Sequence, residues 1–230
     1  MIRCACAVCH SPDPRDNRTR ASIYLATPEL KFVVDTGTDC RNQCLRENIC
    51  EVDAAIFTHP HTDHIMGFDD LRRFAAPRGG RMPVYASAKT MADLERVYAF
   101  AFEAVSPCPG YLKPEPHVVR GPFSVGKTTL TPLPVPHGST EPYAYLFTRD
   151  EVKLLAYLSD CSAVPDEIAR KLAGVKLLVI DALRAEPHPT QPSVGPALEV
   201  ADRVHTGRPP FPPNHPDAPH DPDPALPPHA

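Results

Sequence analysis

The chain has 230 residues, enough for one domain with a sizeable buried core. Its formal net charge of −4 argues against a nucleic-acid-binding surface, and it has no run of about 18 apolar residues that could span a bilayer. The first residues lack the apolar stretch of a secretory signal. We therefore expect a cytoplasmic protein whose eight cysteines are reduced thiols or metal ligands.

In the first part of the chain, the apolar residues predict strands and one helix. Residues 21–27 and 31–35 are expected to form a hairpin, because both are rich in β-formers and a turn sequence separates them. Residues 39–48 have a helical pattern. Two short strands are predicted over 54–58 and 82–86.

In the second part, helices and strands alternate. We predict a helix over 88–104, several strands between 118 and 160, and a helix over 164–173. The continuous apolar run 175–181 is typical of a strand buried on both faces, and an amphipathic helix follows over 193–204. This order favours a layered α/β (α+β) domain.

The predicted domain covers residues 1–205, and residues 206–230 form a separate C-terminal tail. Nearly half of the residues from Pro209 onward are proline, with Phe211 and Leu226 as the main apolar side chains. Such a segment can neither form a helix interior nor bury much surface. We expect it to be extended or disordered.

Four candidate metal ligands lie within six residues, directly after the strand predicted at 54–58. They are the side chains of His59, His61, Asp63 and His64. Imidazole nitrogen and carboxylate oxygen suit Zn²⁺, Mn²⁺ or Fe²⁺, and two pairs of ligands can serve two adjacent ions. The alternative, a polar turn with chance histidines, explains this spacing poorly.

The wider pattern resembles the metallo-β-lactamase superfamily. Val33-Val34-Asp35-Thr36-Gly37 precedes Thr-His-x-His-x-Asp-His, and a single His137 and a single Asp160 come later. The resemblance implies a four-layer αββα sandwich. It also implies one ion held by His59, His61 and His137, a second held by Asp63, His64 and a C-terminal histidine, and Asp160 bridging both.

Taken alone, His137 could be an ordinary loop histidine and Asp160 a helix N-cap. Asp35 is expected behind the ligands, where it would orient a ligand histidine or the loop. Two adjacent ions would lower the pKa of a water from 15.7 toward about 7 and polarise the oxygen under attack. The pattern therefore predicts a metal-dependent hydrolase.

Three cysteines near the N-terminus, Cys4, Cys6 and Cys9, are close enough in sequence to wrap one structural Zn²⁺. The alternative is three small core residues. With the segments DPRDNRTRASIYL and GFDDLRRF, this Cys-rich knuckle resembles the branch that contains phosphoribosyl 1,2-cyclic phosphate phosphodiesterase. In that branch a C-terminal histidine completes a Cys₃His zinc site, and the substrate is a cyclic phosphodiester. The pyrroloquinoline quinone protein B branch shares a similar knuckle.

Three departures separate the chain from this branch. Met1 falls inside the region of the usual first strand, so we expect that strand to be missing. His215 and His220 stand in place of a Thr-His-x-x-His element, and they either replace its ligands or lie in the tail. Gln191 replaces a second histidine, which leaves His188 as a proton donor or a loop residue.

Three other patterns in the sequence are not interpreted as functional sites. Residues 121–128 (GPFSVGKT) match a P-loop, but a strand-like segment follows where a helix is required, so no ATP site is expected. We interpret Cys40 and Cys44 as core residues. Arg72 and Arg73 are expected on a solvated helix face, although they could meet a substrate phosphate.

The ligand pattern predicts a metal-dependent hydrolase. The resemblance implies a phosphodiesterase that opens a small cyclic phosphate ester by attack of a metal-bridging hydroxide, with Asp63 and His188 as the expected catalytic residues. Its cofactors would be two divalent ions (Zn or Mn) and one structural Zn. A small phosphate ester is the expected partner, a membrane or nucleic acid is not, and a homodimer is left open. The alternatives are a truncated, weakly active or inactive metal-binding remnant, or a pyrroloquinoline quinone protein B-like protein.

Overall fold

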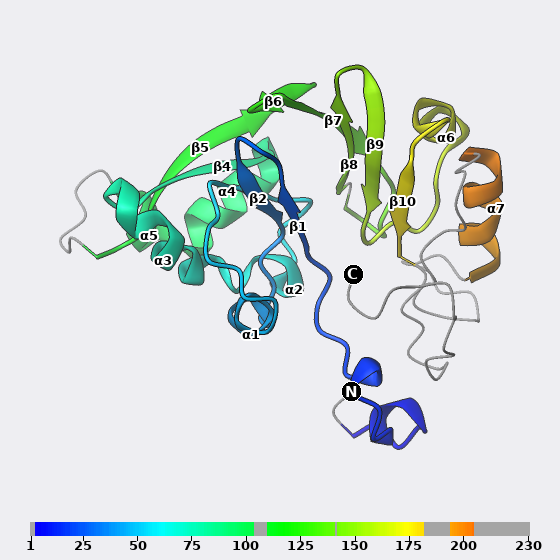
Figure 1. The fold of residues 1–230 in the computed structure, drawn as a ribbon, viewed down its shortest axis with the longest axis horizontal. Coiled ribbons are helices and arrows are strands. Elements are labelled where there is room, and N and C mark those ends of the chain that lie inside the picture. Colours follow the sequence, from blue (N-terminus) through cyan, green and yellow to red (C-terminus); the bar gives the residue numbers. More distant parts are fainter. Residues whose placement is uncertain (1–2, 104–109, 141, 182–193, 205–230) are drawn as a thin grey trace.

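A computed structural model describes residues 3–103, 110–140, 142–181 and 194–204 of the protein. Two five-stranded sheets lie face to face, and helices cover their outer faces (Figure 1). The strand orders are β1-β2-β3-β4-β5 and β10-β9-β8-β7-β6. None of the helices in these ranges is long and apolar enough to span a membrane.

The first sheet is antiparallel at one edge and parallel elsewhere. Its strands are β1 (Ile23–Ala26), β2 (Lys31–Val34), β3 (Ala54–Ile56), β4 (Arg81–Ser87) and β5 (Lys113–Val119). The β1–β2 hairpin is antiparallel, whereas β2, β3, β4 and β5 pair in parallel. The helices connected with this sheet are α1 (Cys40–Arg46), α2 (Thr62–Ile65), α3 (Arg72–Ala75), α4 (Ala88–Val97) and α5 (Ala99–Phe102).

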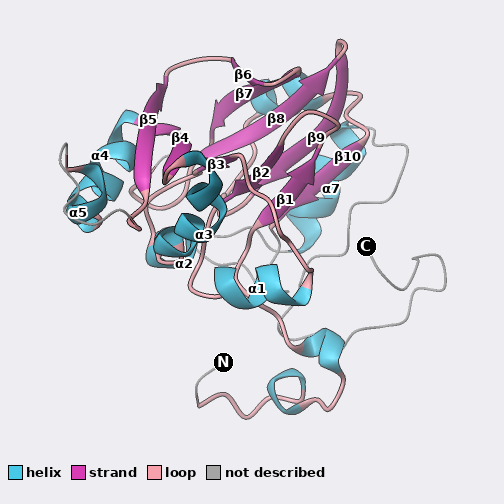
Figure 2. Cartoon of the chain, turned by 60° about the vertical axis from the view of Figure 1, so that its left-hand side comes forward, coloured by secondary structure: helices cyan, strands magenta, loops and turns pink. Residues whose placement is uncertain are grey.

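The second sheet is mostly antiparallel. Its strands are β6 (Phe123–Val125), β7 (Thr128–Pro134), β8 (Tyr143–Arg149), β9 (Val152–Leu158) and β10 (Leu177–Ile180). Only β9 and β10 pair in parallel, through a crossover that contains α6 (Asp166–Leu172), and α7 (Val194–Val204) follows. Figure 2 shows both sheets from the side, with α7 beyond the second one.

Three hydrophobic clusters fill the spaces between the four layers. The cluster between the sheets includes Phe32 and Ile56 from the first sheet and Tyr145 and Phe147 from the second. A second cluster packs the first sheet against α4 and its neighbours, and a third packs the second sheet against α6 and α7. The four-layer αββα sandwich is therefore confirmed. Residues 3–22, before β1, contain two 3-10 turns, at Val8–His10 and Pro14–Asp16, and no strand.

The structure corrects several details of the predicted elements. The helix predicted over 88–104 breaks at Tyr98, between α4 and α5. Strand β5 was missed because Pro114 and Pro116 lie in it; they are tolerated since β5 is an edge strand of the described sheet. Strand β10 is likewise an edge strand, so its residues alternate between buried and half-buried instead of being buried on both faces.

The segment that matches a P-loop is the hairpin between β6 and β7. Gly126 has a φ of 61° and forms the turn, and the chain then enters β7 at Thr128. A phosphate-binding loop needs a helix at this point. The hairpin agrees with the sequence-based interpretation that this segment is not a P-loop.

One ion pair joins the β1–β2 turn to the end of β8. Arg149 donates to both carboxylate oxygens of Glu29, with Nη1 2.8 Å from Oε2. The pair therefore links the two sheets at the edge of their interface. Hydrogen bonding from Arg149 lowers the pKa of Glu29 to about 2.

This pair makes part of the stability depend on pH. The pKa of Glu29 is about 2 in the folded protein and about 4.3 in an unfolded chain. Its contribution is thus fully present above the unfolded value and is lost as the pH falls toward 2. Glu29→Gln should lower the free energy of unfolding at pH 7, and the difference should vanish near pH 2. Urea titrations at both pH values measure it.

Asp150→Asn is the matched control. Its carboxylate lies 3.9 Å from the same guanidinium, but its side chain is 85% exposed. A surface pair of this kind contributes little. Equal effects of the two substitutions at pH 7 would contradict the importance of the Glu29 pair.

Candidate metal centre

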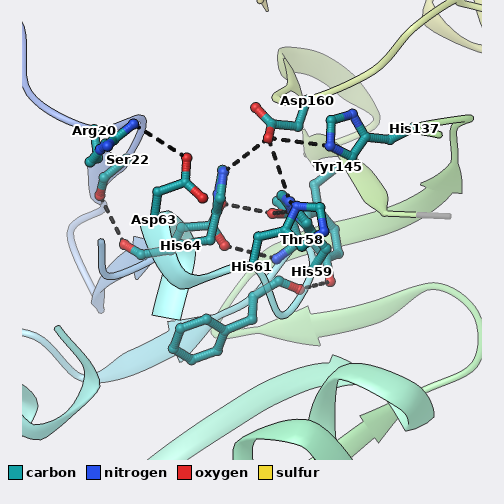
Figure 3. Close-up of polar contacts among 12 residues, drawn as sticks. Arg20, Ser22, Thr58, His59, His61, Asp63, His64, His137, Tyr145 and Asp160 are labelled. Carbon is teal, nitrogen blue, oxygen red and sulfur yellow. Dashed lines mark hydrogen bonds and ion pairs between the residues drawn. The ribbon is translucent and has the colours of Figure 1, made fainter. Parts of the chain in front are cut away.

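The histidine run lies where the chain leaves β3 at the centre of the first sheet. His61 is extended (φ −65°, ψ 151°), and α2 begins at the next residue, Thr62. The chain therefore changes direction inside the run. As a result, the side chains before and after this bend point into one space (Figure 3).

The second sheet supplies two more side chains from the ends of its strands. His137 follows β7 in a tight turn closed by backbone hydrogen bonds with Thr140. Asp160 follows β9 and has a φ of 48°, a left-handed conformation that Asp adopts more readily than most residues. The site thus lies at the strand ends of both sheets and uses residues from each.

These side chains form two groups that share Asp160. His59, His61, His137 and Asp160 make the first group, and Asp63, His64 and Asp160 make the second. Within each group the candidate ligand atoms lie within 4.8 Å of one another. Asp160 Oδ2 lies 3.5 Å from His59 Nε2, 3.3 Å from His64 Nε2 and 3.7 Å from His137 Nε2. The sequence-predicted ligands are therefore brought together.

The carboxylates of this site favour positive charge beside them, and burial opposes it. Burial alone would lower the pKa of His64, but the carboxylates of Asp35 and Asp160 outweigh it and raise that pKa to about 10. For Asp160, burial opposes ionisation, yet His59 and His64 lower its pKa below the usual range. Burial lowers the pKa of His61, and the charges of its histidine neighbours add to that effect.

Asp35 organises the histidines from behind. It is fully buried at the end of β2 with a φ of 62°. Its Oδ1 accepts from the Thr58 backbone N–H at 2.9 Å, and its Oδ2 accepts from the Thr58 hydroxyl and from His64 Nδ1, both at 2.8 Å. Because the Thr58 hydroxyl donates to Asp35, its oxygen can accept from His59 Nδ1, 3.0 Å away.

One carboxylate thus sets the tautomers of two histidines. In the neutral form that a metal ion binds, each ring keeps its proton on Nδ1, and the Nε2 lone pairs of His59 and His64 face the space around Asp160. Asp35 therefore contacts a candidate ligand histidine from the side away from Asp160, the position expected of an orienting residue. Thr58 was not predicted as part of the site, although it is the Thr of the Thr-His-x-His pattern.

Two glycines let the surrounding loops approach closely. Thr36 N donates to His64 O at 2.7 Å, and Gly67 N donates to Thr36 O at 2.8 Å. A Cβ at Gly37 would lie 2.3 Å from Asp63 O, and one at Gly67 would lie 2.3 Å from Gly37 O. Neither contact is possible for a real side chain, so both positions require glycine.

The residues present fit a pair of divalent ions. His59 Nε2 faces His61 Nδ1 at 3.0 Å, and one ligand atom each from His137 and Asp160 completes that group. Nitrogen and carboxylate donors in this arrangement suit Zn²⁺, Mn²⁺ or Fe²⁺. The second group has three ligands within the described residues. His215 and His220, the sequence-based candidates for a fourth, lie outside them, as do His188 and Gln191.

The N-terminal knuckle forms a third group. Cys4, Cys6 and Cys9 place their sulfurs within 4.8 Å of one another, and Cys9 N donates to Cys6 Sγ at 3.4 Å. This backbone hydrogen bond from Cys9 lowers the pKa of Cys6, which favours the thiolate that a zinc ion binds. His10 Nε2 lies 3.0 Å from Cys4 O, and His10 is not a member of the group.

The remaining candidates lie away from these groups. Cys40 is buried and Cys44 half-buried on α1, and neither belongs to a metal-binding group of the described residues. Arg72 and Arg73 are exposed on α3, with Arg72 Nε 3.7 Å from Asp69. In contrast, Arg20, which the sequence did not single out, lies 3.6 Å from Asp63. Its position depends on a loop contact that no local pattern predicts.

A family model described as a β-lactamase superfamily domain matches residues 31–209. The chain belongs to this superfamily. Among solved structures, a new diphosphatase from the PhnP family superposes with a TM-score of 0.80 at 37% identity, covering 90% of this chain and 77% of that one. The metallo-β-lactamase sandwich inferred from the histidine pattern is thereby confirmed.

The curated relatives of this superfamily member carry diverse names. An octanoyltransferase of Porphyromonas gingivalis is 30% identical over 88% of this chain and 40% of its own length. An exodeoxyribonuclease (YycJ) of Bacillus anthracis is 27% identical over 70% of this chain and 57% of its own length. A coenzyme PQQ synthesis protein B of Xanthomonas campestris is 23% identical, with 75% and 66% covered. The chain thus spans about two fifths to two thirds of these relatives.

Removing the Asp35 carboxylate should weaken metal binding. In Asp35→Asn the side-chain NH₂ can face His64 Nδ1, which must then accept a hydrogen bond instead of donating one. The ring proton moves to Nε2, the nitrogen that would bind metal, so we expect metal affinity to fall about 10–100-fold. Competition with a chromogenic chelator measures the affinity, and thermal unfolding measures stability. Asp69→Asn, on the half-exposed acidic neighbour of Arg72, is the control. Unchanged affinity in Asp35→Asn would contradict the orienting role.

The knuckle should hold one zinc independently of the histidine site. Cys6→Ser is expected to remove one tightly held zinc per chain, because a tetrahedral site loses a thiolate ligand. His59→Ala should leave that zinc in place. Elemental analysis after dialysis measures both. Cys50→Ser, at an exposed cysteine outside the group, is the control, and an unchanged zinc count in Cys6→Ser would refute the site.

Proposed function

We propose that the protein hydrolyses a phosphodiester, with a small cyclic phosphate ester as substrate, at a binuclear metal centre. The observation that carries the proposal is Asp160, which belongs to both ligand groups and so can join two ions. When bound, two adjacent divalent ions lower the pKa of a water and polarise the phosphoryl oxygen. Zn²⁺ or Mn²⁺ matches the donor set.

Different residues of the protein would orient the ligands, admit the substrate and take part in the reaction. Asp35 and Thr58 hold His59 and His64 in the tautomer that binds metal, so the site is organised before substrate arrives. His61 is exposed, whereas His59 is buried, which indicates that substrate approaches from the side of His61. Asp63 remains a predicted catalytic residue, and His188 remains a predicted proton donor to the leaving oxygen.

Two relatives support hydrolysis of a phosphate bond. The PhnP-family structure is named a diphosphatase, and the curated relative YycJ is named an exodeoxyribonuclease. The first name favours a second candidate, hydrolysis of a diphosphate, because that structure is 37% identical over most of this chain. The other hypotheses are an inactive remnant of the family and a protein of the PQQ synthesis protein B type.

The proposal is tested by metal analysis together with turnover. The full chain, loaded with Zn²⁺ or Mn²⁺, should bind two ions outside the knuckle and hydrolyse bis(p-nitrophenyl) phosphate. His61→Ala should lower kcat by at least 100-fold, since it removes a ligand of the first group. A nucleoside 2′,3′-cyclic phosphate and a dinucleoside diphosphate, assayed in parallel, separate the two candidate activities.

His117→Ala is the matched control, because His117 is an exposed histidine on β5 that stacks on Tyr85, outside both ligand groups. It should retain the native rate and metal content. One ion or none, without turnover on any of the three substrates, would leave the inactive remnant as the better hypothesis.

A further inference from the structure

Arg20 places a positive charge beside the candidate metal centre. Figure 3 shows the Arg20 side chain directed at Asp63. Its Nη1 lies 3.6 Å from Asp63 Oδ2, and 58% of its side chain is exposed. In the described part of the chain, this is the one ion pair that joins an arginine or lysine to a carboxylate of the two ligand groups. The residue precedes β1, far from the histidine run in sequence.

The backbone of Arg20 is fixed on three sides. Its N–H donates to Asp39 Oδ2 at 2.9 Å, and its carbonyl accepts from Gln43 Nε2 at 2.7 Å. Its Cβ lies against Gly37, where an added Cβ would come within 2.9 Å. The guanidinium therefore extends into solvent from an anchored position, next to α2, which carries Asp63.

The contact with Asp63 does not by itself explain this arrangement. At 3.6 Å it is longer than a hydrogen bond, and ion pairs this exposed contribute little to stability. If Asp63 binds a cation, its charge is shared with that ion, and the attraction for Arg20 weakens. The guanidinium then has donors available for another anion.

We propose that Arg20 binds a second anionic group of the substrate, adjacent to the phosphoryl group under attack. A guanidinium recognises phosphate oxygens through paired, charge-assisted hydrogen bonds. Arg20 is thus a specificity-determining residue that favours substrates with two neighbouring phosphates or a phosphate and a carboxylate. This inference rests on the proposed function, because it takes the reacting phosphate to lie at the two ligand groups.

The test measures binding of two non-hydrolysable probes to the metal-loaded full chain by calorimetry. Methylenebisphosphonate carries two adjacent anionic groups, and methylphosphonate carries one. Arg20→Gln should raise the Kd of methylenebisphosphonate at least tenfold and that of methylphosphonate by less than threefold. Arg20→Lys should lie between, since it keeps the charge without the paired donors. Arg46→Gln, at an exposed arginine on α1, should change neither Kd.

Metal content decides between substrate binding and a structural role. If Arg20→Gln loses metal and both Kd values rise together, Arg20 acts only by holding Asp63, and the proposal is overturned. It is also overturned if neither Kd changes. Failure of the proposed function looks different: native protein would then bind neither probe in a metal-dependent manner and would hydrolyse no phosphodiester.

Discussion

The site depends on one buried carboxylate. Asp35 has no contact with solvent, yet it accepts three hydrogen bonds, two from Thr58 and one from His64. A buried charge is costly unless it is paired in this way. The same bonds join the ends of β2 and β3 to α2. The fold therefore stabilises the carboxylate, and the carboxylate in turn fixes the imidazoles that face Asp160.

Much of this could be predicted from the sequence, because the ligands lie in a short run with strong spacing. The six-residue run, together with His137 and Asp160, indicated the site, and the structure brings all of them together. The four-layer sandwich followed from the same resemblance and from the order of strands and helices. A short run of ligands predicts a site well because the chain bends after a strand end, and this bend lets neighbouring side chains converge.

Other features depend on contacts that sequence patterns do not contain. Thr58 acts through its hydroxyl only because Asp35 and His59 lie on either side of it. Arg20 reaches Asp63 because Gln43 and Asp39 hold its backbone from α1 and the preceding loop. Strand β5 was not predicted because it contains prolines, which cannot donate a backbone hydrogen bond. The strand forms nevertheless, since a strand at a sheet edge does not need every N–H. Each of these outcomes is decided by packing between distant segments.

The division of the ligands between the two sheets has a thermodynamic consequence. His59, His61 and His64 belong to the first half of the fold, whereas His137 and Asp160 belong to the second. An ion shared by both halves is a reversible cross-link between residues far apart in sequence. An ion that bound the folded chain alone would add RT ln(1 + [L]/Kd) to the free energy of unfolding, about 2.7 kcal/mol at a hundredfold excess over Kd. The concentration of free metal would then help to set the fraction of the chain that is folded.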